Sequence, residues 1–453
     1  MRKTIQLEQA ESAGSAKILN AFSTAKRIAG GLFLLLLTIV VLAPDAAAQF
    51  ANGADVSWLP QMAAAGYVFK NQSGVEMNCL DILKEEGINA IRIRAWVNPK
   101  GGYCDTKYVT SLAHQADSMG FDILIDFHCS DTWADPSHQY TPAAWASDSL
   151  PQLLTNLYDY VYGVMDTLKM AGVVPKWVQI GNETNNGMMW PLGMATTHMA
   201  NFAQMIDTGY AAVKAIDSTT QVIVHLSNSY DDTMYRWMFD GLEKYGARWD
   251  IIGMSAYPYW ANLPWQTDDS LTLVTMKDMI ARYHKKVMVV EAGYAYSQPV
   301  TANHYLMDLI AKTKSVGGLG VFYWEPECYN WQGYQMGAWN PANEEPTVAL
   351  DAFLGKYATA VVGPTRPEGF NLHVYPNPFN PTTTIQYNLP VRSNVSINIY
   401  NVLGQEVRQL VSGYQNQGTH TLSWSANGLA SGVYFCRLSA SDYLAMRKLV
   451  LLK

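Results

Sequence analysis

The sequence predicts an α/β fold, a (β/α)8 TIM barrel followed by a small all-β sandwich domain. Short apolar runs alternate with amphipathic stretches up to about residue 355, and eight such runs can be counted. After Leu354 the pattern changes to an alternation of apolar and polar residues, which is typical of β-strands with one buried face. The change of pattern predicts two domains of different fold class.

Residues 1–48 are expected to be a signal peptide. The stretch "KRIAGGLFLLLLTIVVLAPDAAAQF" has a basic flank, an apolar run from about Gly30 to Ala43, and small residues up to Ala48. The apolar run is shorter than the roughly 20 residues that a membrane-spanning helix needs, so cleavage is favoured over anchoring. The mature chain would begin near Gln49 and leave the cytoplasm.

Residues 49–355 are the expected barrel. Stretches between the apolar runs, such as "THMANFAQMIDTGYAAVKAID", carry apolar residues at three- and four-residue spacing, which predicts helices. Strands that are buried on both faces and followed by helices form a parallel sheet, and eight such units predict a closed barrel. An open doubly wound sheet is the alternative fold, but it is less favoured because no glycine-rich phosphate loop follows the first strand. The expected strands begin near Gly53, Ile88, Phe121, Lys176, Gln221, Asp250, Lys286 and Gly318.

A linker over residues 356–371 and a β-sandwich over residues 372–453 are predicted after the barrel. The segment "GPTRPEGFNLHVYPNPFNPTTTIQYNLP" is rich in Pro, Asn and Thr. Later runs such as "NVSINIYNVLG" and "GVYFCRLSA" alternate with the period of a strand. Short alternating strands separated by turns favour a sandwich.

Composition and charge favour a neutral partner. The 453-residue chain has a formal net charge of -7 and only 15% charged residues, so no nucleic acid partner is expected. Its 14 Trp and 27 Tyr are abundant, and those outside the core offer flat faces that suit sugar rings. We expect a polysaccharide substrate and a monomeric protein.

The carboxyl ends of the predicted strands carry ionisable and aromatic residues. In such barrels this face builds the active site, and buried polar groups cost free energy unless they are paired. A ring of them at the mouth of a barrel rich in Val, Ile and Leu therefore indicates a functional site. The predicted ring contains Asp55, Arg92, Arg94, Asp126, His128, Asn182, Glu183, His225, Asn228, Tyr257, Glu291, Trp324 and Glu325.

Glu183 and Glu291 end the fourth and seventh strands and would project into one cavity. Two carboxyl groups that flank a glycosidic bond can act as acid and nucleophile, which predicts glycosidase chemistry. Glu183 would be the general acid, with a pKa raised by a less polar site, and Glu291 the nucleophile, kept ionised by Arg92 or Arg94. Either glutamate alone would more simply be a helix cap or a salt-bridge partner, but the two together favour catalysis.

The motifs around these residues add a resemblance. "GNET", "VMVVEAGY" and "FYWEP" resemble strand ends of retaining barrel glycosidases with catalytic glutamates on strands four and seven. "IDFHCSDTWADPSHQ", "VQIGNETNNGMMWPLG" and "YPYW" resemble glycoside hydrolase family 53, the endo-β-1,4-galactanases, and the match runs over about residues 53–355. The resemblance implies a secreted retaining enzyme that hydrolyses β-1,4-galactan, with Glu183 as acid/base and Glu291 as nucleophile. Another retaining glycanase such as a mannanase, or a non-catalytic surface glycan-binding protein, is the alternative.

Further residues are predicted to bind the substrate. Asn182 would donate to the 2-hydroxyl group of the sugar, and Trp324 would offer a flat face to the ring. His128 and Tyr257 would hydrogen-bond the carboxylates or the sugar. A structural role is the alternative for each. The other candidates, at strand ends or in the loops "SDTWADP" and "GMMW", are Arg92, Arg94, Asp131, Trp133, Asp135, Trp190, His225 and Asn228.

No metal and no cofactor are predicted. His128 and His225 with nearby acids could be ligands, but no HxH or HExxH spacing is present. The segment after Glu291 lacks the carboxylate cluster that calcium requires, unlike the long loop of some bacterial family members. Where the family usually has Tyr after "DFH", this chain has Cys129, which removes a hydroxyl from the groove. The scattered cysteines, for which core positions are favoured over a Cys79–Cys104 pair, are Cys79, Cys104, Cys129, Cys328 and Cys436.

The tail has its own resemblance. "YPNPFNPTTTIQYNLP", "NIYNVLGQEVRQL" and "LASGVYFCRL" resemble the C-terminal sorting domain of the type IX secretion system. The resemblance implies export through the outer membrane by that machinery, to the cell surface or beyond. A carbohydrate-binding module is the alternative, but it would expose a row of aromatics, whereas Tyr375, Trp424 and Tyr434 are expected to face the core.

Overall fold

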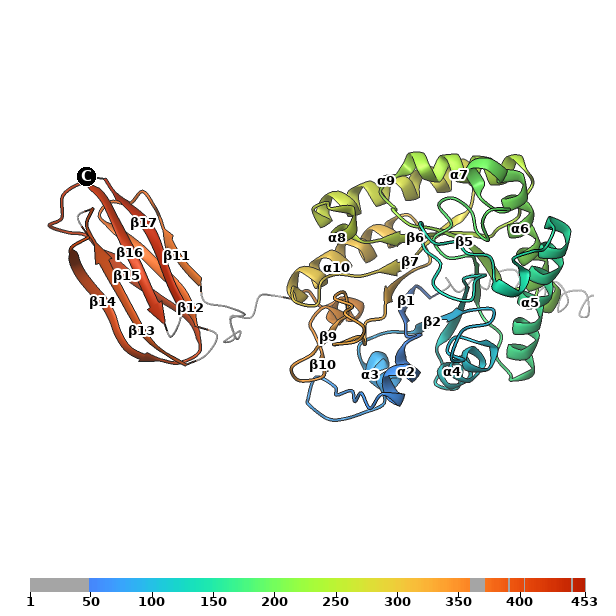
Figure 1. Ribbon diagram of the computed structural model, residues 1–453, viewed down its shortest axis with the longest axis horizontal. Helices are drawn as coiled ribbons and strands as arrows, with labels where there is room; N and C mark the ends of the chain where they lie inside the picture. Colours follow the sequence, from blue (N-terminus) through green and yellow to red (C-terminus); the bar gives the residue numbers. More distant parts are fainter. Residues whose placement is uncertain (1–48, 359–370, 390–391, 403, 441–442, 453) are drawn as a thin grey trace, which may run out of the picture. The chain divides into compact units, whose positions relative to one another are not determined.

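Eight parallel β-strands close into a barrel in the larger of two folded units (Figure 1). Each strand pairs with the next along the chain, and the last pairs with the first, with Ala51 opposite Gly320. This order confirms the predicted (β/α)8 barrel and excludes the open sheet. The strands are β1 (Ala51–Asp55), β2 (Ala90–Ala95), β3 (Asp122–Phe127), β4 (Trp177–Ile180), β5 (Gln221–Leu226), β6 (Ile251–Ala256), β7 (Lys286–Ala292) and β8 (Gly320–Trp324).

The computed structural model describes residues 49–358, 371–389, 392–402, 404–440 and 443–452. The chain divides into two compact units, residues 1–358 and 359–453. The predicted signal peptide and most of the predicted linker lie outside the described residues. Within the described residues, no helix combines the length and the apolar character that a membrane crossing needs.

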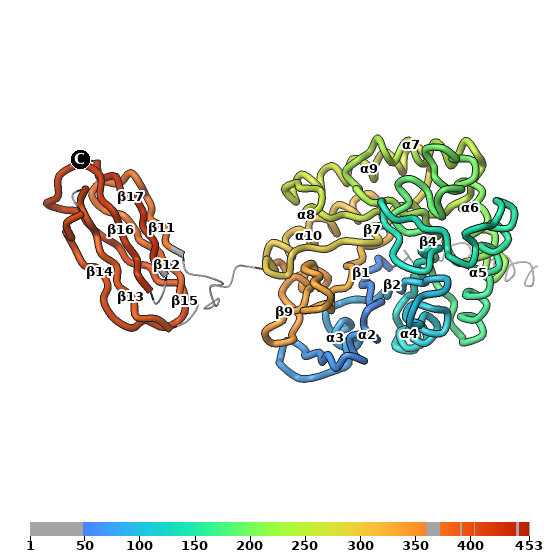
Figure 2. Tube along the Cα trace, in the orientation of Figure 1, coloured from blue at the N-terminus to red at the C-terminus, as the bar shows by residue number. Residues whose placement is uncertain are grey.

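Helices follow the strands and surround the barrel, as the chain trace in Figure 2 shows. In the helix after β3, Leu153, Leu157, Val161, Val164 and Leu168 are all buried. Their spacing of three and four residues places them on one face, which packs on the barrel. The helices are α2 (Leu59–Ala64), α3 (Cys79–Glu85), α4 (Thr106–Ser118), α5 (Leu150–Met170), α6 (Ala195–Ile216), α7 (Asp232–Lys244), α8 (Pro258–Ala261), α9 (Trp265–Tyr283) and α10 (Pro299–Ser315).

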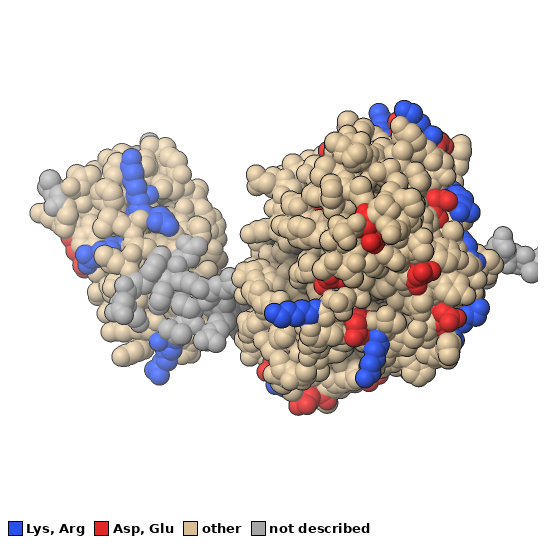
Figure 3. Space-filling view, turned by 45° about the vertical axis from the view of Figure 1, so that its right-hand side comes forward, with Lys and Arg blue, Asp and Glu red and all other residues tan. Residues whose placement is uncertain are grey.

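Short elements complete this unit. Two 3₁₀ turns and one two-stranded antiparallel sheet lie in the connections. They are η1 (Ala143–Trp145), η2 (Leu350–Leu354), β9 (Trp339–Asn340) and β10 (Glu345–Pro346). Figure 3 shows charged side chains scattered over the visible face of the unit, most of which is uncharged.

Two layers of side chains fill the inside of the barrel. The first layer is apolar, and Trp177 meets Phe322 edge to face with 6.2 Å between ring centroids. A Cβ atom at Gly53 would lie 2.1 Å from the Phe322 ring, so only glycine fits there. Residues two apart on a strand point the same way, so a second, polar layer follows toward the carboxyl ends. Leu124, Trp177 and Ile223 of the first layer are thus succeeded by the buried Asp126, Gln179 and His225.

The C-terminal unit is a β-sandwich, as predicted. A three-stranded and a four-stranded antiparallel sheet share one core, to which Ile385 and Trp424 contribute from the first sheet and Ile397 and Leu438 from the second. The first sheet contains β11 (Asn371–Tyr375), β12 (Thr382–Leu389) and β15 (Gly418–Ser425). The second contains β14 (Glu406–Gln415), β13 (Ser393–Tyr400), β16 (Gly432–Ala440) and β17 (Tyr443–Leu451).

Of the three tail aromatics that were expected to face the core, one does not. Trp424 and Tyr434 are buried, but the prediction for Tyr375 is wrong, because it is 52% exposed. Leu372 and Val374 on the same strand pack into the core, so the alternation of the strand turns Tyr375 outward.

The five cysteines occupy buried positions and are all free. Core positions are therefore confirmed, and Cys79 is not bonded to Cys104.

Candidate active site

A cavity of about 270 Å³ opens at the carboxyl ends of the barrel strands. It contains both predicted catalytic glutamates, one after β4 and the other on β7. Apart from Ala134 and Trp260, every residue that lines it is expected from the sequence. The lining residues are His128, Trp133, Ala134, Asp135, Asn182, Glu183, Tyr257, Trp260, Glu291 and Trp324.

Several strand ends turn through the left-handed backbone region, which non-glycine residues seldom adopt. Glu183, Cys129 and Glu325 have φ values of 45°, 53° and 48°. Gly181 precedes this turn with φ of 79°, and a Cβ atom there would lie 2.5 Å from the Thr184 side chain. Such backbone conformations are costly and concentrate at functional sites.

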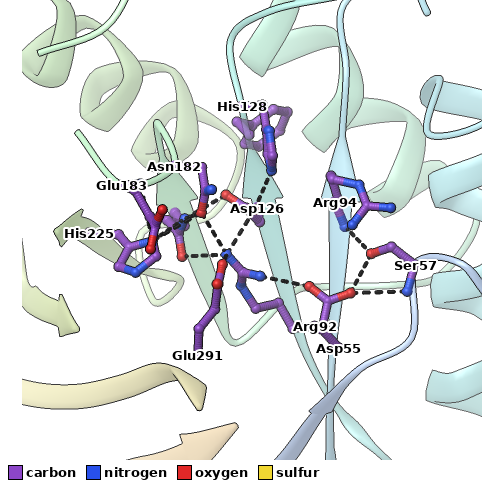
Figure 4. A network of polar contacts seen from close by, with 12 residues as sticks. Asp55, Ser57, Arg92, Arg94, Asp126, His128, Asn182, Glu183, His225 and Glu291 are labelled. Carbon is purple, nitrogen blue, oxygen red and sulfur yellow. Dashed lines mark hydrogen bonds and ion pairs between the residues drawn. The ribbon is translucent and has the colours of Figure 1, made fainter. Parts of the chain in front are cut away.

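Arg92 lies at the centre of the polar layer, fully buried, and Figure 4 shows the side chains that converge on it. Its Nη1 atom lies 2.6 Å from Asp55 Oδ2, and its Nη2 atom lies 2.8 Å from both Asp126 Oδ2 and Glu291 Oε1. Nη2 also donates to Asn182 Oδ1 at 3.0 Å. Burial opposes the charge of Arg92, but these carboxylates outweigh burial and raise its pKa.

Arg94 does not contact Glu291. It pairs with Glu325, with 3.1 Å between Nη1 and Oε1, and its guanidinium carbon lies 4.0 Å from the centroid of the Trp133 ring. Of the two arginines proposed to hold the Glu291 carboxylate, the structure therefore brings only Arg92 into contact with it. Arg94 instead supports Trp133, one wall of the cavity, and Trp133 contacts Trp324 at 5.9 Å between ring centroids.

Glu291 is 6% exposed and is held by two donors. Arg92 forms the ion pair described above, and the Tyr257 hydroxyl donates to Oε2 at 3.2 Å. Burial raises the pKa of Glu291, and the negative charges of Glu183 and Asp126 add to this shift, but the Arg92 cation opposes it. The carboxyl groups of Glu291 and Glu183 therefore titrate as an interacting pair.

Glu183 accepts one side-chain hydrogen bond, from Ser255 Oγ to Oε1 at 2.8 Å. Burial raises the pKa of Glu183 to about 7, while the bond from Ser255 lowers it and the nearby Asp135 raises it. A carboxyl group that is still protonated near neutral pH can act as a general acid.

A chain of hydrogen bonds fixes the orientation of Ser255. The backbone N–H of Glu183 donates to His225 Nδ1 at 3.3 Å, so the hydrogen of the neutral His225 ring lies on Nε2. Nε2 lies 2.7 Å from Ser255 Oγ and therefore donates to it, which leaves the Ser255 hydroxyl free to donate to Glu183. Burial and the charge of Arg92 lower the pKa of His225 well below its usual value, in agreement with a neutral ring.

His128 and Asn182 line the cavity, and most of their polar atoms already form hydrogen bonds within the protein. His128 Nδ1 accepts from the Ala134 N–H at 3.0 Å, so Nε2 carries the hydrogen and donates to Asp126 at 3.0 Å. The Asn182 side chain accepts from Arg92 and donates to the Ala134 carbonyl at 2.9 Å, which leaves its second amide hydrogen for a ligand.

Six predicted substrate-binding residues lie outside the cavity lining, among them Arg92 and Arg94, whose contacts are described above. Asp131 accepts from the backbone N–H groups of Asn98 and Ala143, and the Trp190 ring donates to the Asn186 carbonyl, so each fixes a loop. His225 lies beneath the cavity in the polar layer. Asn228 adopts φ of 53°, which Asn tolerates better than most residues, in the turn after β5. The six residues are Arg92, Arg94, Asp131, Trp190, His225 and Asn228.

Trp260, Ser255 and Gln179 are site residues that the sequence analysis did not single out. Trp260 lies in the quoted motif "YPYW", three residues after Tyr257, and one helical turn brings the two rings together. Ser255 and Gln179 lie on strands two residues before Tyr257 and four before Glu183. A polar residue inside a buried strand is the signal that could have found both.

Among the described residues, no group of three or more His, Cys, Asp or Glu is arranged to hold a metal ion.

Comparison with known families identifies both units. The profile of Glycosyl hydrolase family 53 matches residues 51–360, and that of the Secretion system C-terminal sorting domain matches residues 373–452. A curated relative, the probable arabinogalactan endo-beta-1,4-galactanase A of Aspergillus terreus, is 36% identical over 320 residues, which cover 64% of this chain and 90% of the relative.

Two solved structures are similar to the barrel. The GH53 catalytic domain from Ignisphaera aggregans shares 31% identity with a TM-score of 0.61, covering 67% of this chain and 95% of that chain. A structure from a study of two fungal beta-1,4-galactanases shares 28% identity with a TM-score of 0.62, covering 67% of this chain and 98% of that chain.

Proposed function

The chain belongs to glycosyl hydrolase family 53, and on that premise we propose that it is a retaining endo-β-1,4-galactanase that acts on the galactan side chains of pectin. The observation that carries the proposal is the pair Glu183 and Glu291, which face one cavity from β4 and β7. The similarity to relatives named as galactanases supports the choice of substrate.

Glu291 would be the nucleophile and Glu183 the acid/base. Near neutral pH the interacting pair keeps one proton. Two donors, Arg92 and Tyr257, stabilise the anion on Glu291, whereas Glu183 accepts from Ser255 alone. The negative charge therefore belongs on Glu291 and the proton on Glu183.

Double displacement follows from this distribution. Glu291 attacks the anomeric carbon while Glu183 gives its proton to the leaving oxygen, so a galactosyl ester forms on Glu291. Glu183 then removes a proton from water, and the water oxygen displaces the ester with a second inversion. Because Ser255 occupies Oε1 of Glu183, the proton resides on Oε2. Asn182 is placed to donate its second amide hydrogen to the sugar, and Trp324 to support the ring.

Substrate preference tests this proposal. The protein is incubated with β-1,4-galactan, mannan, xylan and arabinan, and released reducing ends are measured. We expect release from galactan alone. A higher rate on mannan would move the assignment to another glycanase, and no release from any polymer would favour a glycan-binding protein.

Removing the Ser255 hydroxyl is expected to change the pH profile. Because its hydrogen bond lowers the pKa of Glu183, the Ser255→Ala variant should hold the acid proton to higher pH. The alkaline limb of the kcat/KM profile, where the acid loses its proton, should therefore move to higher pH. Loss of one hydrogen bond of about 1 kcal/mol should also lower the plateau roughly fivefold.

Ser255→Thr, which keeps a hydroxyl, should restore the alkaline limb. Ser229→Ala removes another buried hydroxyl, which contacts Thr272 and neither glutamate, and should leave the profile unchanged. An alkaline limb that stays in place in Ser255→Ala would contradict the role of Ser255.

The C-terminal sorting domain indicates export of the protein to the cell surface or the extracellular space. We propose that the type IX machinery of the outer membrane carries out this export, after an N-terminal signal peptide has directed the chain across the inner membrane. We also propose that the enzyme is a monomer.

The tail is expected to be dispensable for hydrolysis and necessary for delivery. Every residue that lines the cavity precedes Glu325, so a protein of residues 49–358 should cleave soluble galactan within about twofold of the full chain. The same truncation in the natural host should leave the enzyme in the periplasm, as fractionation would measure. Normal arrival at the surface would contradict the sorting role, and lost binding to insoluble polysaccharide would indicate a carbohydrate-binding module.

A further inference from the structure

Three tryptophan side chains, which we call the tryptophan wall, form one cluster at the candidate active site. Trp58 follows β1, Trp133 lies in the loop after β3, and Trp324 ends β8. The ring centroids of Trp58 lie 5.5 Å from those of Trp133 and 5.1 Å from those of Trp324, and Trp133 also contacts Trp324. Trp133 and Trp324 line the cavity, whereas Trp58 is buried, at 6% exposure. The wall therefore joins three separate strand ends.

The Glu325 carboxylate is linked to all three members of this wall. Glu325 is fully buried and directly follows Trp324 in the chain. Its Oε2 atom accepts from the backbone N–H of Trp58 at 3.0 Å, and its Oε1 atom pairs with Arg94 Nη1 at 3.1 Å. The Arg94 guanidinium in turn lies over the Trp133 ring, as described above. One carboxylate is thus connected, directly or through Arg94, to the residues that place each ring.

The backbone of Glu325 holds this carboxylate in place. Glu325 adopts φ of 48°, in the left-handed region, and its N–H donates to the Asp55 carbonyl at 3.1 Å. Its own carbonyl accepts from the Cys328 N–H at 3.1 Å. Such a conformation is costly for a residue other than glycine and is concentrated at functional sites. The position of Glu325 at the mouth of the barrel therefore indicates a role beyond packing.

Glu327 supplies a further hydrogen-bond donor to Glu325. Glu327 is fully buried, and no N–H or O–H of another described residue donates to either of its carboxyl oxygens. Its side-chain partner is the Glu325 carboxyl group. Burial and the negative charge of Glu325 raise the pKa of Glu327 well above its usual value. Because a buried carboxylate without donors would be costly, Glu327 keeps its proton and hydrogen-bonds Glu325 with it.

We propose that Glu325 is a positioning residue for the hydrolysis, which sets the tryptophan wall against the sugar at the cleaved bond. The Arg94 cation and the neutral Glu327 carboxyl group hold Glu325 in this role. The inference rests on the proposed function, and it adds a residue that lies outside the cavity lining and acts only through the wall.

Glu325→Gln tests this proposal, because it keeps the shape of the side chain and removes the charge that pairs with Arg94. We expect kcat on β-1,4-galactan to fall by about tenfold or more, since a shifted wall misplaces the sugar relative to Glu291. The limbs of the pH profile should stay in place, because Glu325 is not among the groups that chiefly shift the pKa of Glu183 or Glu291. The near-UV circular dichroism spectrum, which reports the packing of aromatic rings, should change.

Two further variants accompany Glu325→Gln. Glu86→Gln is the matched control, because burial also raises the pKa of Glu86, but its carboxylate accepts from Gln72, away from the wall. It should match the wild type in kcat and in the near-UV spectrum. The double variant of Glu325→Gln with Arg94→Met should lose no more activity than the worse of the two single variants, because each single change breaks the same pair.

Glu327 provides a milder test that leaves the pair of Glu325 and Arg94 intact. Glu327→Gln keeps an N–H donor and should stay within about twofold of the wild-type kcat, whereas Glu327→Met has no donor and should lower kcat roughly fivefold. Equal losses in the two variants would contradict the donor role of Glu327. If Glu325→Gln does not fold, Glu327→Met carries the same measurements.

The result that would overturn the proposal is an unchanged kcat in Glu325→Gln with only a lower midpoint of urea unfolding, which would show a structural role alone. A displaced pH profile would overturn it too, because Glu325 would then act electrostatically on the pair of Glu183 and Glu291. A wild type that hydrolyses no galactan would refute the proposed function instead. The near-UV spectrum of Glu325→Gln would still show whether Glu325 sets the wall, and an unchanged spectrum would refute that placement.

Discussion

Replacing Glu291 with glutamine is expected to lower kcat on β-1,4-galactan by about ten-thousandfold or more, because the amide cannot attack the anomeric carbon. Glu183→Gln should lower kcat by about 10²–10⁴-fold, since it removes the proton donor but leaves the nucleophile. Reducing-end assays on purified variants measure both losses.

Glu86→Gln is the matched control for these two variants. Glu86 is also buried, at 4% exposure, but its carboxylate accepts a hydrogen bond from Gln72 Nε2, outside the cavity. Its replacement should leave kcat unchanged. Near wild-type activity in Glu291→Gln or in Glu183→Gln would refute the assignment of that residue, provided that circular dichroism shows an intact fold.

Replacing Arg92 with methionine is expected to lower the free energy of unfolding by about 3–5 kcal/mol at neutral pH, because it leaves buried carboxylates without their cation. Asp55, Asp126 and Glu291 all pair with this one side chain. Urea denaturation of the wild type and the variant measures the loss. Hydrolysis should fall as well, because the anion on Glu291 loses its ion pair.

The pH dependence separates this cause from a packing defect. In the wild type, burial raises the pKa of Asp126, but Arg92 and His128 together outweigh burial and lower it, so Asp126 contributes stability above its unfolded pKa. In the Arg92→Met variant, burial raises the pKa of these carboxyl groups without an opposing cation, so they protonate more readily. The difference in free energy of unfolding between the variant and the wild type should therefore shrink as pH falls toward about 4. A loss that is independent of pH would indicate packing alone.

Arg248→Met is the control for Arg92. Arg248 pairs with Asp207 at 2.5 Å, but both side chains are exposed, at 54% and 37%. An exposed pair contributes only about 0–1 kcal/mol, so this variant should unfold almost like the wild type.

The barrel could be predicted because its strands carry a simple signal. Runs such as Ile251–Ala256 are mostly apolar and buried on both faces, and each is followed by a helical period, which in a parallel sheet fixes both the strands and their order. The residues after each strand then share one face of the barrel, whatever the detail of the loops. The sequence alone therefore predicts that Glu183 and Glu291 lie together at this face.

Side-chain partners could not be predicted in the same way. Arg92 and Arg94 lie two residues apart on β2 and point the same way, so the period of the strand does not distinguish them. The role of each arginine depends on which carboxylate lies within reach: Glu291 pairs with Arg92, and Glu325 pairs with Arg94. This choice depends on the stagger of β7 and β8, which the sequence pattern does not encode.

The positions of loop residues could not be predicted from the sequence either. Trp133 and Trp190 are both tryptophans in loops after strands, yet the first lines the cavity and the second hydrogen-bonds within its own loop. Their positions depend on turns and local hydrogen bonds, and no periodicity predicts these. Trp260 could not be predicted as a site residue for the same reason. Only the short helix α8 brings its ring against Tyr257.

The central claim is a retaining hydrolysis of β-1,4-galactan by Glu183 and Glu291, and a time course of proton NMR spectra on the wild type with soluble galactan tests it most directly. Two displacements, at Glu291 and then by water activated by Glu183, preserve the configuration of the anomeric carbon. The β-anomer of the new reducing end should therefore appear first, and the α-anomer should follow only through mutarotation. Initial appearance of the α-anomer would show inversion and contradict the account.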